Sequence, residues 1–288
     1  MIKLGIAFAA IVALIKGFQS IYQRKNALDT DEFVTAWSSR VFGIPVLATV
    51  IAYRGLPELS ADFFLLAIPQ GIVIAGTSIL IAKAYKESDA SIVTPMFAIS
   101  PILVLFTSFF MLGELPSILG VIGIILTALG AYILKAKESE NILDPFRKLW
   151  EERGVQLILV VIVIYSITAN TDKIGVGMSS PVMWPLIIYT ISGIFLTPVM
   201  MKKSPEWKSK IKTEWKPLSF LGLMGGISII FQMTAVDLTL VSYVVSIKRL
   251  SIPITVILSY IMLNEKESFA WRVAGSAIMA VGALLIYI

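Results

Sequence analysis

The chain has 288 residues, of which 57% are hydrophobic and only 15% charged, and its formal net charge is +5. Soluble domains are about half apolar and about a quarter charged, so this composition, with a mean hydropathy of +0.86, predicts a membrane protein. The sequence contains neither cysteine nor histidine, which excludes disulfides, thiolate sites, histidine metal clusters and Ser/His or Cys/His catalytic pairs. We therefore expect no enzyme, no cofactor and no metal site.

Ten apolar segments follow one another along the chain, and each is about long enough to cross a bilayer as a helix of roughly 20 residues. The segments lie at about 4–22, 33–53, 62–82, 90–112, 116–135, 155–172, 181–201, 218–237, 240–263 and 269–287. The sequence thus predicts an all-α, multi-pass protein with ten transmembrane helices in a plasma or inner membrane. Its surroundings are the lipid bilayer, and no separate soluble domain fits into the remaining length.

The two halves of the chain repeat at a constant spacing. Three residues of the first half recur 151 positions later, namely Ala84 as Ala235, Ser91 as Ser242 and Glu114 as Glu265. Each unit has five spans, an odd number, so the second unit enters the membrane from the opposite side and forms an inverted repeat. We expect the repeats at 1–144 and 145–288. In secondary transporters the interface between such repeats holds the substrate site.

These features resemble the ten-helix, EamA-like branch of the drug/metabolite transporter superfamily. The resemblance rests on the alanine-rich end of the third span, the proline of the fourth span, and MLGE ending at Glu114, with counterparts in the second half that end in MLNE. It implies a central cavity lined by spans one to four and six to nine, with spans five and ten at the periphery. It also implies transport by alternating access.

The basic residues are distributed unevenly between the two membrane faces. Seventeen of the 24 Lys and Arg lie on the face opposite both termini, here called the basic face, and three lie on the termini face. The positive-inside rule would place the basic face in the cytoplasm, whereas the resembled family has both termini there, so the orientation stays open. Since Lys and Arg in short loops set membrane topology, we expect no nucleic-acid partner.

Two adjacent cations, Lys248 and Arg249, lie well inside the ninth span. Each costs about 2.5 to 3.5 kcal/mol at a helix centre and normally faces a cavity or a partner. Asp172 and Asp237 fall near the ends of their predicted spans, so the sequence predicts a positive cavity without a compensating acid. Pro253 cannot donate to the carbonyl of Arg249, which predicts a kink or hinge beside the pair.

The pair is similar to the one in the plastid sugar-phosphate/phosphate translocators, a related branch. That resemblance implies that Lys248 and Arg249 hold the phosphate of a substrate. The translocators carry a further lysine four residues before the proline of the fourth span, but Phe97 stands four residues before Pro101 here. The resemblance therefore supports an anion in general more than a phosphate ester in particular.

Other residues inside the predicted spans are candidates for the same site. We expect Lys16 and Arg40 to complete its charge, and Gln19, Asn170 and Trp184 to contact the rest of the substrate. Each of the last three is also explained by a hydrogen bond between helices or at the membrane interface. Pro101, Pro253, Glu114 and Glu265 are candidates for hinges and gates, although an acid before a helix also serves as an ordinary cap.

The sequence therefore predicts a secondary active transporter that moves a small anionic metabolite, such as a carboxylate or phosphate ester, by exchange. One alternative is an exporter of amino acids or other zwitterionic metabolites. Another, from a different class, is a non-transporting membrane subunit. The glycine pairs Gly123/Gly130 and Gly275/Gly282 allow close packing of helices or contact in a homodimer.

Overall fold

The computed structural model describes residues 1–25, 32–88, 90–136, 151–263 and 269–288, and these are helical with short connections. The first half contains α1 (Ile2–Lys25), α2 (Glu32–Val41), α3 (Ile44–Arg54), α4 (Ala61–Glu87), α5 (Ala90–Met96), the 3₁₀ helix η1 (Phe97–Ile99), α6 (Ser100–Leu112) and α7 (Ile118–Ala136). The second half contains α9 (Arg153–Gly177), α10 (Met183–Lys203), α11 (Trp207–Leu238), α12 (Val241–Lys248), α13 (Ser251–Leu263) and α14 (Phe269–Tyr287).

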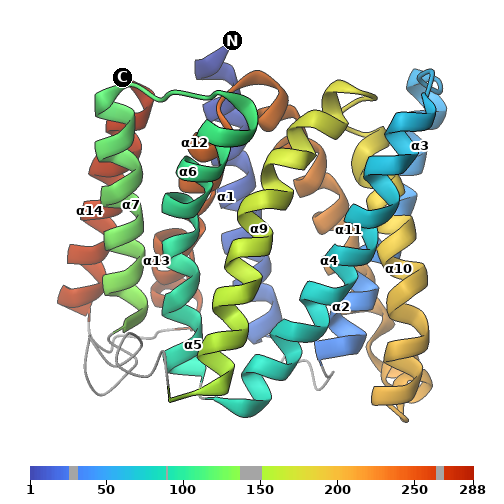
Figure 1. Ribbon diagram of the computed structural model, residues 1–288. Coiled ribbons are helices and arrows are strands. Elements are labelled where there is room, and N and C mark those ends of the chain that lie inside the picture. Colours follow the sequence, from blue (N-terminus) through green and yellow to red (C-terminus); the bar gives the residue numbers. More distant parts are fainter. Residues whose placement is uncertain (26–31, 89, 137–150, 264–268) are drawn as a thin grey trace.

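The predicted fold class is confirmed. Eight stretches of the described chain are long and apolar enough to cross a membrane, and α7 and α14 add two shorter apolar helices, Ile118–Leu134 and Val273–Tyr287. Both chain ends lie at the same edge of the molecule (Figure 1). Helices therefore run across the membrane in alternating directions, as ten spans require.

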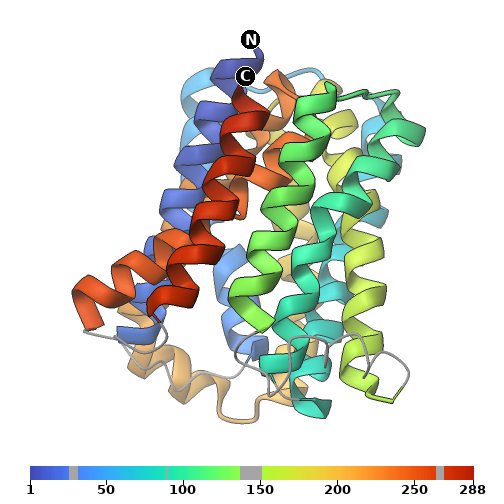
Figure 2. The ribbon, with the colours of Figure 1, turned by 90° about the vertical axis from the view of Figure 1, so that its left-hand side faces the viewer.

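The two repeats pack in equivalent ways. In the first repeat α1 lies against α11 and α13, and its counterpart α9 lies against α4 and α6. Figures 1 and 2 show α7 and α14 side by side at one edge of the bundle, away from its middle. The fifth and tenth spans are thus peripheral, as the resemblance implies, and the other eight surround the centre.

The glycine pairs serve contact within one chain. A Cβ atom on Gly123 would meet the carbonyl oxygen of Gly282 at 2.5 Å, and one on Gly130 would meet that of Gly275 at 2.7 Å. Close backbone approach through small residues is a common way for membrane helices to associate, because lipid gives no hydrophobic driving force between them. Packing of α7 on α14 therefore accounts for the pattern that also suggested a homodimer.

Two helix boundaries differ from the sequence prediction. The second span is broken between α2 and α3 at Phe42 and Gly43, because Pro45 in the first turn of α3 has no N–H to donate backwards. The sixth span does not end at residue 172, since α9 continues to Gly177. The charges of Asp172 and Lys173 ended the apolar segment, but they do not end the helix.

Candidate functional site

The centre of the site is a pair of interrupted helices. In the second half α12 ends at Lys248 and α13 begins at Ser251, so the chain turns at Arg249 and Leu250. In the first half η1, at Phe97–Ile99, interrupts the helix in the same way, and residues 97–99 correspond to 248–250 at the repeat spacing of 151. Pro101 and Pro253 follow within the first turn of α6 and of α13. The two interruptions are thus equivalent in backbone but different in charge.

An inner cavity of about 320 Å³ lies between the repeats. Helices α1, α2, α4, α6, α9, α10, α11 and α12 all contribute to its wall. Its charged and polar lining residues are Lys16, Arg40, Ser100, Tyr165, Thr168, Asp172, Trp184, Tyr189, Gln232, Lys248 and Arg249. A cavity of this size and polarity fits a small polar metabolite.

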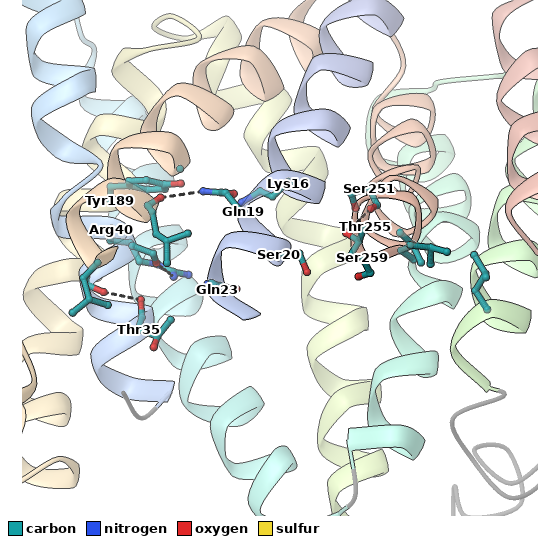
Figure 3. Close-up of a pocket in the computed structure, with 18 residues that line it drawn as sticks. Lys16, Gln19, Ser20, Gln23, Thr35, Arg40, Tyr189, Ser251, Thr255 and Ser259 are labelled. Carbon is teal, nitrogen blue, oxygen red and sulfur yellow. Dashed lines mark hydrogen bonds between the residues drawn. The ribbon is translucent and has the colours of Figure 1, made fainter. Parts of the chain in front are cut away.

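An outer cavity of about 510 Å³ adjoins the inner one, and the two share Lys16, Arg40 and Tyr189. Its other polar residues come from α1, α2 and α13 and lie toward the basic-face ends of α1 and α2 (Figure 3). They are Gln19, Ser20, Gln23, Thr35, Ser38, Ser39, Ser251, Thr255 and Ser259. Lys16 and Gln23 are exposed, whereas Val236 and Val241 at the other end of the inner cavity are buried. The cavities are therefore reached from the basic face.

Four cations line these cavities. Arg249 donates through a terminal guanidinium nitrogen to Ser100 Oγ of the other repeat, and Lys248 Nζ donates to Gln232 Oε1 at 3.1 Å. Arg40 donates to Ser78 Oγ at 3.1 Å and to neighbours in α2. All of these acceptors are neutral, so they orient the cations without neutralising them.

Several donors of these cations remain unused within the described chain. The Nε atoms of Arg40 and Arg249 are buried without a hydrogen-bond partner. Lys16 donates no hydrogen bond to any described residue and forms no ion pair with one, and it lies close enough to Arg40 and Lys248 for their charges to repel. Buried donors normally find acceptors, so the two buried Nε atoms favour an anion in the cavity, and the exposed Lys16 ammonium adds positive charge beside them.

The sequence prediction of a cavity without an acid is wrong. Asp172 lines the inner cavity and lies close enough to Lys248 for their charges to attract. Its Oδ1 accepts from Trp184 Nε1 at 2.8 Å and from Gln70 Nε2 at 3.0 Å. The other carboxylate oxygen takes no hydrogen bond from a described residue. Because α9 extends past residue 172, this side chain lies inside the membrane helix and not at its end.

Two of the residues predicted to contact substrate have hydrogen-bond partners within the protein. Trp184 is fully buried, with its ring 5.7 Å from that of Phe63, and its indole nitrogen is committed to Asp172. Asn170 lies outside both cavities, where its amide donates to Thr107 Oγ1 at 2.9 Å and to the carbonyl of Ser166. Trp184 thus positions the carboxylate, and Asn170 joins α9 to α6.

Gln19 remains a candidate site residue. It lines the outer cavity beside Lys16, and its Nε2 donates to the carbonyl of Leu221 at 3.0 Å (Figure 3). This bond fixes α1 to α11 and leaves the amide oxygen as the group that a substrate could meet. The inner-cavity residue Gln232 accepts the hydrogen bond from Lys248 and so orients that cation.

Glu114 does not cap the helix that follows it, which begins at Ile118. Its Oε2 accepts from the backbone N–H of Val241 at 2.8 Å, and its Oε1 forms an ion pair with Lys173 Nζ at 2.6 Å. The acid therefore caps α12 of the other repeat. Its sequence counterpart, Glu265, lies outside the described residues.

Comparisons with known proteins add independent information. The sequence model of the EamA-like transporter family matches two segments of the chain, residues 3–135 and 152–288, which together make up almost the whole chain. A solved structure, described only as the crystal structure of a protein, has a TM-score of 0.81 and 14% sequence identity over 98% of this chain and 97% of that chain. At that identity the likeness concerns the fold alone. A search of curated proteins gave no match.

Proposed function

We propose that this chain, which belongs to the EamA-like transporter family, moves a small anionic metabolite by alternating access between its inverted repeats. Family membership makes it a multi-pass membrane transporter of the drug/metabolite transporter superfamily, which leaves little support for an enzyme or a non-transporting subunit. The substrate we propose is a carboxylate or a phosphate ester, and the membrane is a plasma or inner membrane. The proposed repeat units remain 1–144 and 145–288.

The observation that carries this proposal is the excess of cations in the cavity. Lys16, Arg40, Lys248 and Arg249 line the inner cavity together with one carboxylate, Asp172. A buried cation costs several kcal/mol unless a counter-charge and hydrogen bonds compensate it. An anion bound between Lys248 and Arg249 would supply both, since a guanidinium can hold a carboxylate or phosphate through two parallel hydrogen bonds. Lys16, Arg40 and Gln19 would contact the remainder.

The same charge balance favours exchange. When the cavity is empty, its excess positive charge must cross the low-dielectric part of the membrane during the conformational change, and this raises the barrier. A bound anion offsets that charge, so the loaded carrier crosses faster than the empty one. Return of the empty carrier then becomes slow, and a second anion on the other side accelerates it.

The interrupted helices supply a route for the change in shape. We propose that α12 and α13 pivot at Arg249 and Leu250, and that η1 serves as the corresponding hinge in the first repeat. Pro101 and Pro253 would keep these points free of regular helical hydrogen bonds. Glu114 and, from the sequence repeat, Glu265 are the proposed gating acids.

A second candidate substrate is an amino acid or another zwitterion, and Asp172 is the observation that favours it. Its free carboxylate oxygen shares the inner cavity with Lys248 and Arg249. A substrate ammonium group could bind this carboxylate while the substrate carboxylate binds the cations. Both candidates use the same cationic pair, and they differ in what they require of Asp172.

Counterflow into proteoliposomes tests the proposal. Vesicles are preloaded with succinate, a sugar phosphate, an α-amino acid or a quaternary ammonium ion, and uptake of the labelled compound is measured. We expect succinate or the sugar phosphate to exchange, and we expect Lys248→Met and Arg249→Met to reduce that exchange by at least about tenfold, the effect of one charged hydrogen bond. Lys83→Met, which changes an exposed lysine paired with Glu87, is the matched control.

The outcomes separate the candidates. Exchange of the amino acid alone would replace the simple anion with the zwitterion. Preferential exchange of the quaternary ammonium ion, or anion exchange that is unchanged in both cavity variants, would overturn the proposal for this site.

A further inference from the structure

A group of charged and backbone contacts closes the termini face of the molecule. Lys173 Nζ lies 2.6 Å from Glu114 Oε1 and donates to the carbonyl of Thr239 at 2.8 Å, and the N–H of Val241 donates to Glu114 Oε2 at 2.8 Å. We call these four groups the latch. Glu114 belongs to the first repeat and the other three belong to the second. The latch therefore spans the interface between the repeats, at the end opposite the open cavities.

The acid of the latch is buried, and its lysine is partly buried. The Glu114 side chain is 7% exposed and that of Lys173 is 28% exposed, and both carboxylate oxygens of Glu114 are occupied. Separating such a pair in a dry interface would leave two uncompensated charges. The latch can therefore open only when water enters the termini face. The shut latch is stable, and all of its contacts break at the same time when the repeats move apart.

One short helix connects the latch to the cation pair. Val241 is the first residue of α12 and Lys248 is the last, so the helix of eight residues spans roughly 10 Å at about 1.5 Å per residue. The N–H of Val241 is one of the groups at a helix start that have no partner within the helix, and a carboxylate there is favourable. Glu114 thus holds one end of the helix, and the proposed substrate group binds at the other.

A second element makes the same connection. On α9 the cavity residue Asp172 directly precedes Lys173 of the latch. One turn of this helix therefore carries a charged residue of the cavity and a charged residue of the latch. Neighbouring residues on a helix point about 100° apart, which lets one side chain face the cavity and the next face the repeat interface. Movement of this turn affects the site and the latch together.

We propose that Glu114 and Lys173 form the termini-face gate of the transporter, and that α12 couples this gate to the binding of an anion at Lys248 and Arg249. The coupling rests on the proposed function, whereas the gate does not. With the latch shut, the cavities open to the basic face. When α12 pivots at Arg249, its first residue leaves Glu114, the ion pair separates and the termini face opens.

The absence of cysteine from the sequence makes site-directed labelling a direct test. Ala169→Cys places one thiol in the inner cavity, a turn before the latch lysine, and Ser20→Cys places one in the outer cavity. Each is labelled from one face at a time with a membrane-impermeant maleimide. We expect both to label from the basic face, and Ala169→Cys to label weakly from the termini face.

Adding Glu114→Gln should raise termini-face labelling of Ala169→Cys by about tenfold, the population change expected for the loss of one charged hydrogen bond. Lys173→Gln should act in the same direction, and the double variant should do little more than either alone, because the two residues form one contact. Glu87→Gln is the matched control, since it removes an ion pair with Arg153 near the basic face and should leave termini-face labelling unchanged.

The comparison of Glu114→Gln and Lys173→Gln with the parent protein needs no substrate, so it tests the gate separately from the proposed function. Unchanged termini-face labelling in both Glu114→Gln and Lys173→Gln would overturn the gate. A rise in the variants, with no response of the otherwise unmodified Ala169→Cys protein to either succinate or inorganic phosphate, would keep the gate and overturn its coupling to anion binding. The full proposal predicts that one of these anions raises termini-face labelling, and that Lys248→Met abolishes this response.

Discussion

The two interrupted helices of this transporter break at equivalent positions of the repeat, but one break is uncharged and the other carries two cations. Residues 97–99 and 248–250 break their helices at equivalent points of the repeat, but Phe97 and Ala98 stand where the second half has Lys248 and Arg249. Both breaks are therefore part of the architecture, and an uncharged sequence is sufficient to make one. The cationic pair is present at one of the two breaks, so the two breaks differ in binding chemistry and share their place in the repeat.

The largest effect should come from Arg249, a cavity cation that also donates a hydrogen bond to Ser100 of the other repeat. We expect Arg249→Met to lower the rate of anion counterflow by about 100-fold, because hydrogen bonds to charged groups contribute about 1.5 to 3 kcal/mol each and a guanidinium can form two. Lys248→Met removes a single point charge and should cost about tenfold. A greater loss from Lys248→Met would contradict this assignment of roles.

Asp172 should distinguish the two candidate substrates. Asp172→Asn keeps an acceptor for Trp184 and removes the negative charge, so apparent affinity for a simple anion should rise by at least about tenfold, since two like charges about 10 Å apart repel by roughly 1.7 kcal/mol at an effective dielectric constant of about 20. For a zwitterion the same change should weaken binding by at least tenfold. The measurement is the concentration dependence of counterflow in the variant and the parent protein.

Ser100 tests how far the uncharged repeat contributes to binding. It accepts a hydrogen bond from Arg249 across the interface. We expect Ser100→Ala to raise the half-saturating anion concentration by about threefold to tenfold, since Arg249 keeps its charge but loses the acceptor that orients it. Ser108→Ala, in the same helix and buried away from both cavities, should leave that concentration unchanged.

Replacing either proline should have the smallest effect on the transport rate, and the two replacements should have equal effects. Pro101→Ala and Pro253→Ala each restore a backbone donor near an interruption, which should slow transport by about twofold to fivefold while leaving anion affinity unchanged, the pattern of a slower conformational step. Stopped-flow counterflow rates and equilibrium binding together measure both quantities. A change in affinity from Pro253→Ala alone would mean that this interruption also shapes the binding site.

Much of this organisation follows from the sequence, because the repeat spacing and the cost of cations within a span are local properties. The ten spans and the break beside Lys248 follow from such patterns, whereas the peripheral position of the fifth and tenth spans was implied by the resemblance to the EamA-like family. Asp172 could not be assigned to the cavity, since its charge ended the apolar segment while the helix itself continued to Gly177. The break at Phe42 and Gly43 lies inside one continuous apolar segment, so the segment boundaries do not reveal it, although Pro45 is compatible with it.

The contacts of the latch could not be predicted from the sequence, for a different reason. Lys173 and Glu114 are 59 residues apart and belong to different repeats, so only the packing of α9 against the end of α6 brings them together. Each residue alone has an ordinary explanation, as a topological charge or a helix cap. Likewise the hydrogen bonds of Trp184 to Asp172 and of Asn170 to Thr107 depend on the packing of separate helices, which the sequence pattern does not contain.

Binding of an anion to the purified protein tests the central claim most directly. Thermal unfolding is followed in detergent at low ionic strength with increasing succinate or inorganic phosphate, since a ligand that binds only the folded state stabilises it in proportion to the logarithm of its concentration above Kd. We predict that at least one of these anions raises Tm in the parent protein, and that the rise disappears when Lys248→Met and Arg249→Met are combined. Equal stabilisation of that double variant, or stabilisation of the parent only by a quaternary ammonium ion, would contradict an anion site at the broken helix.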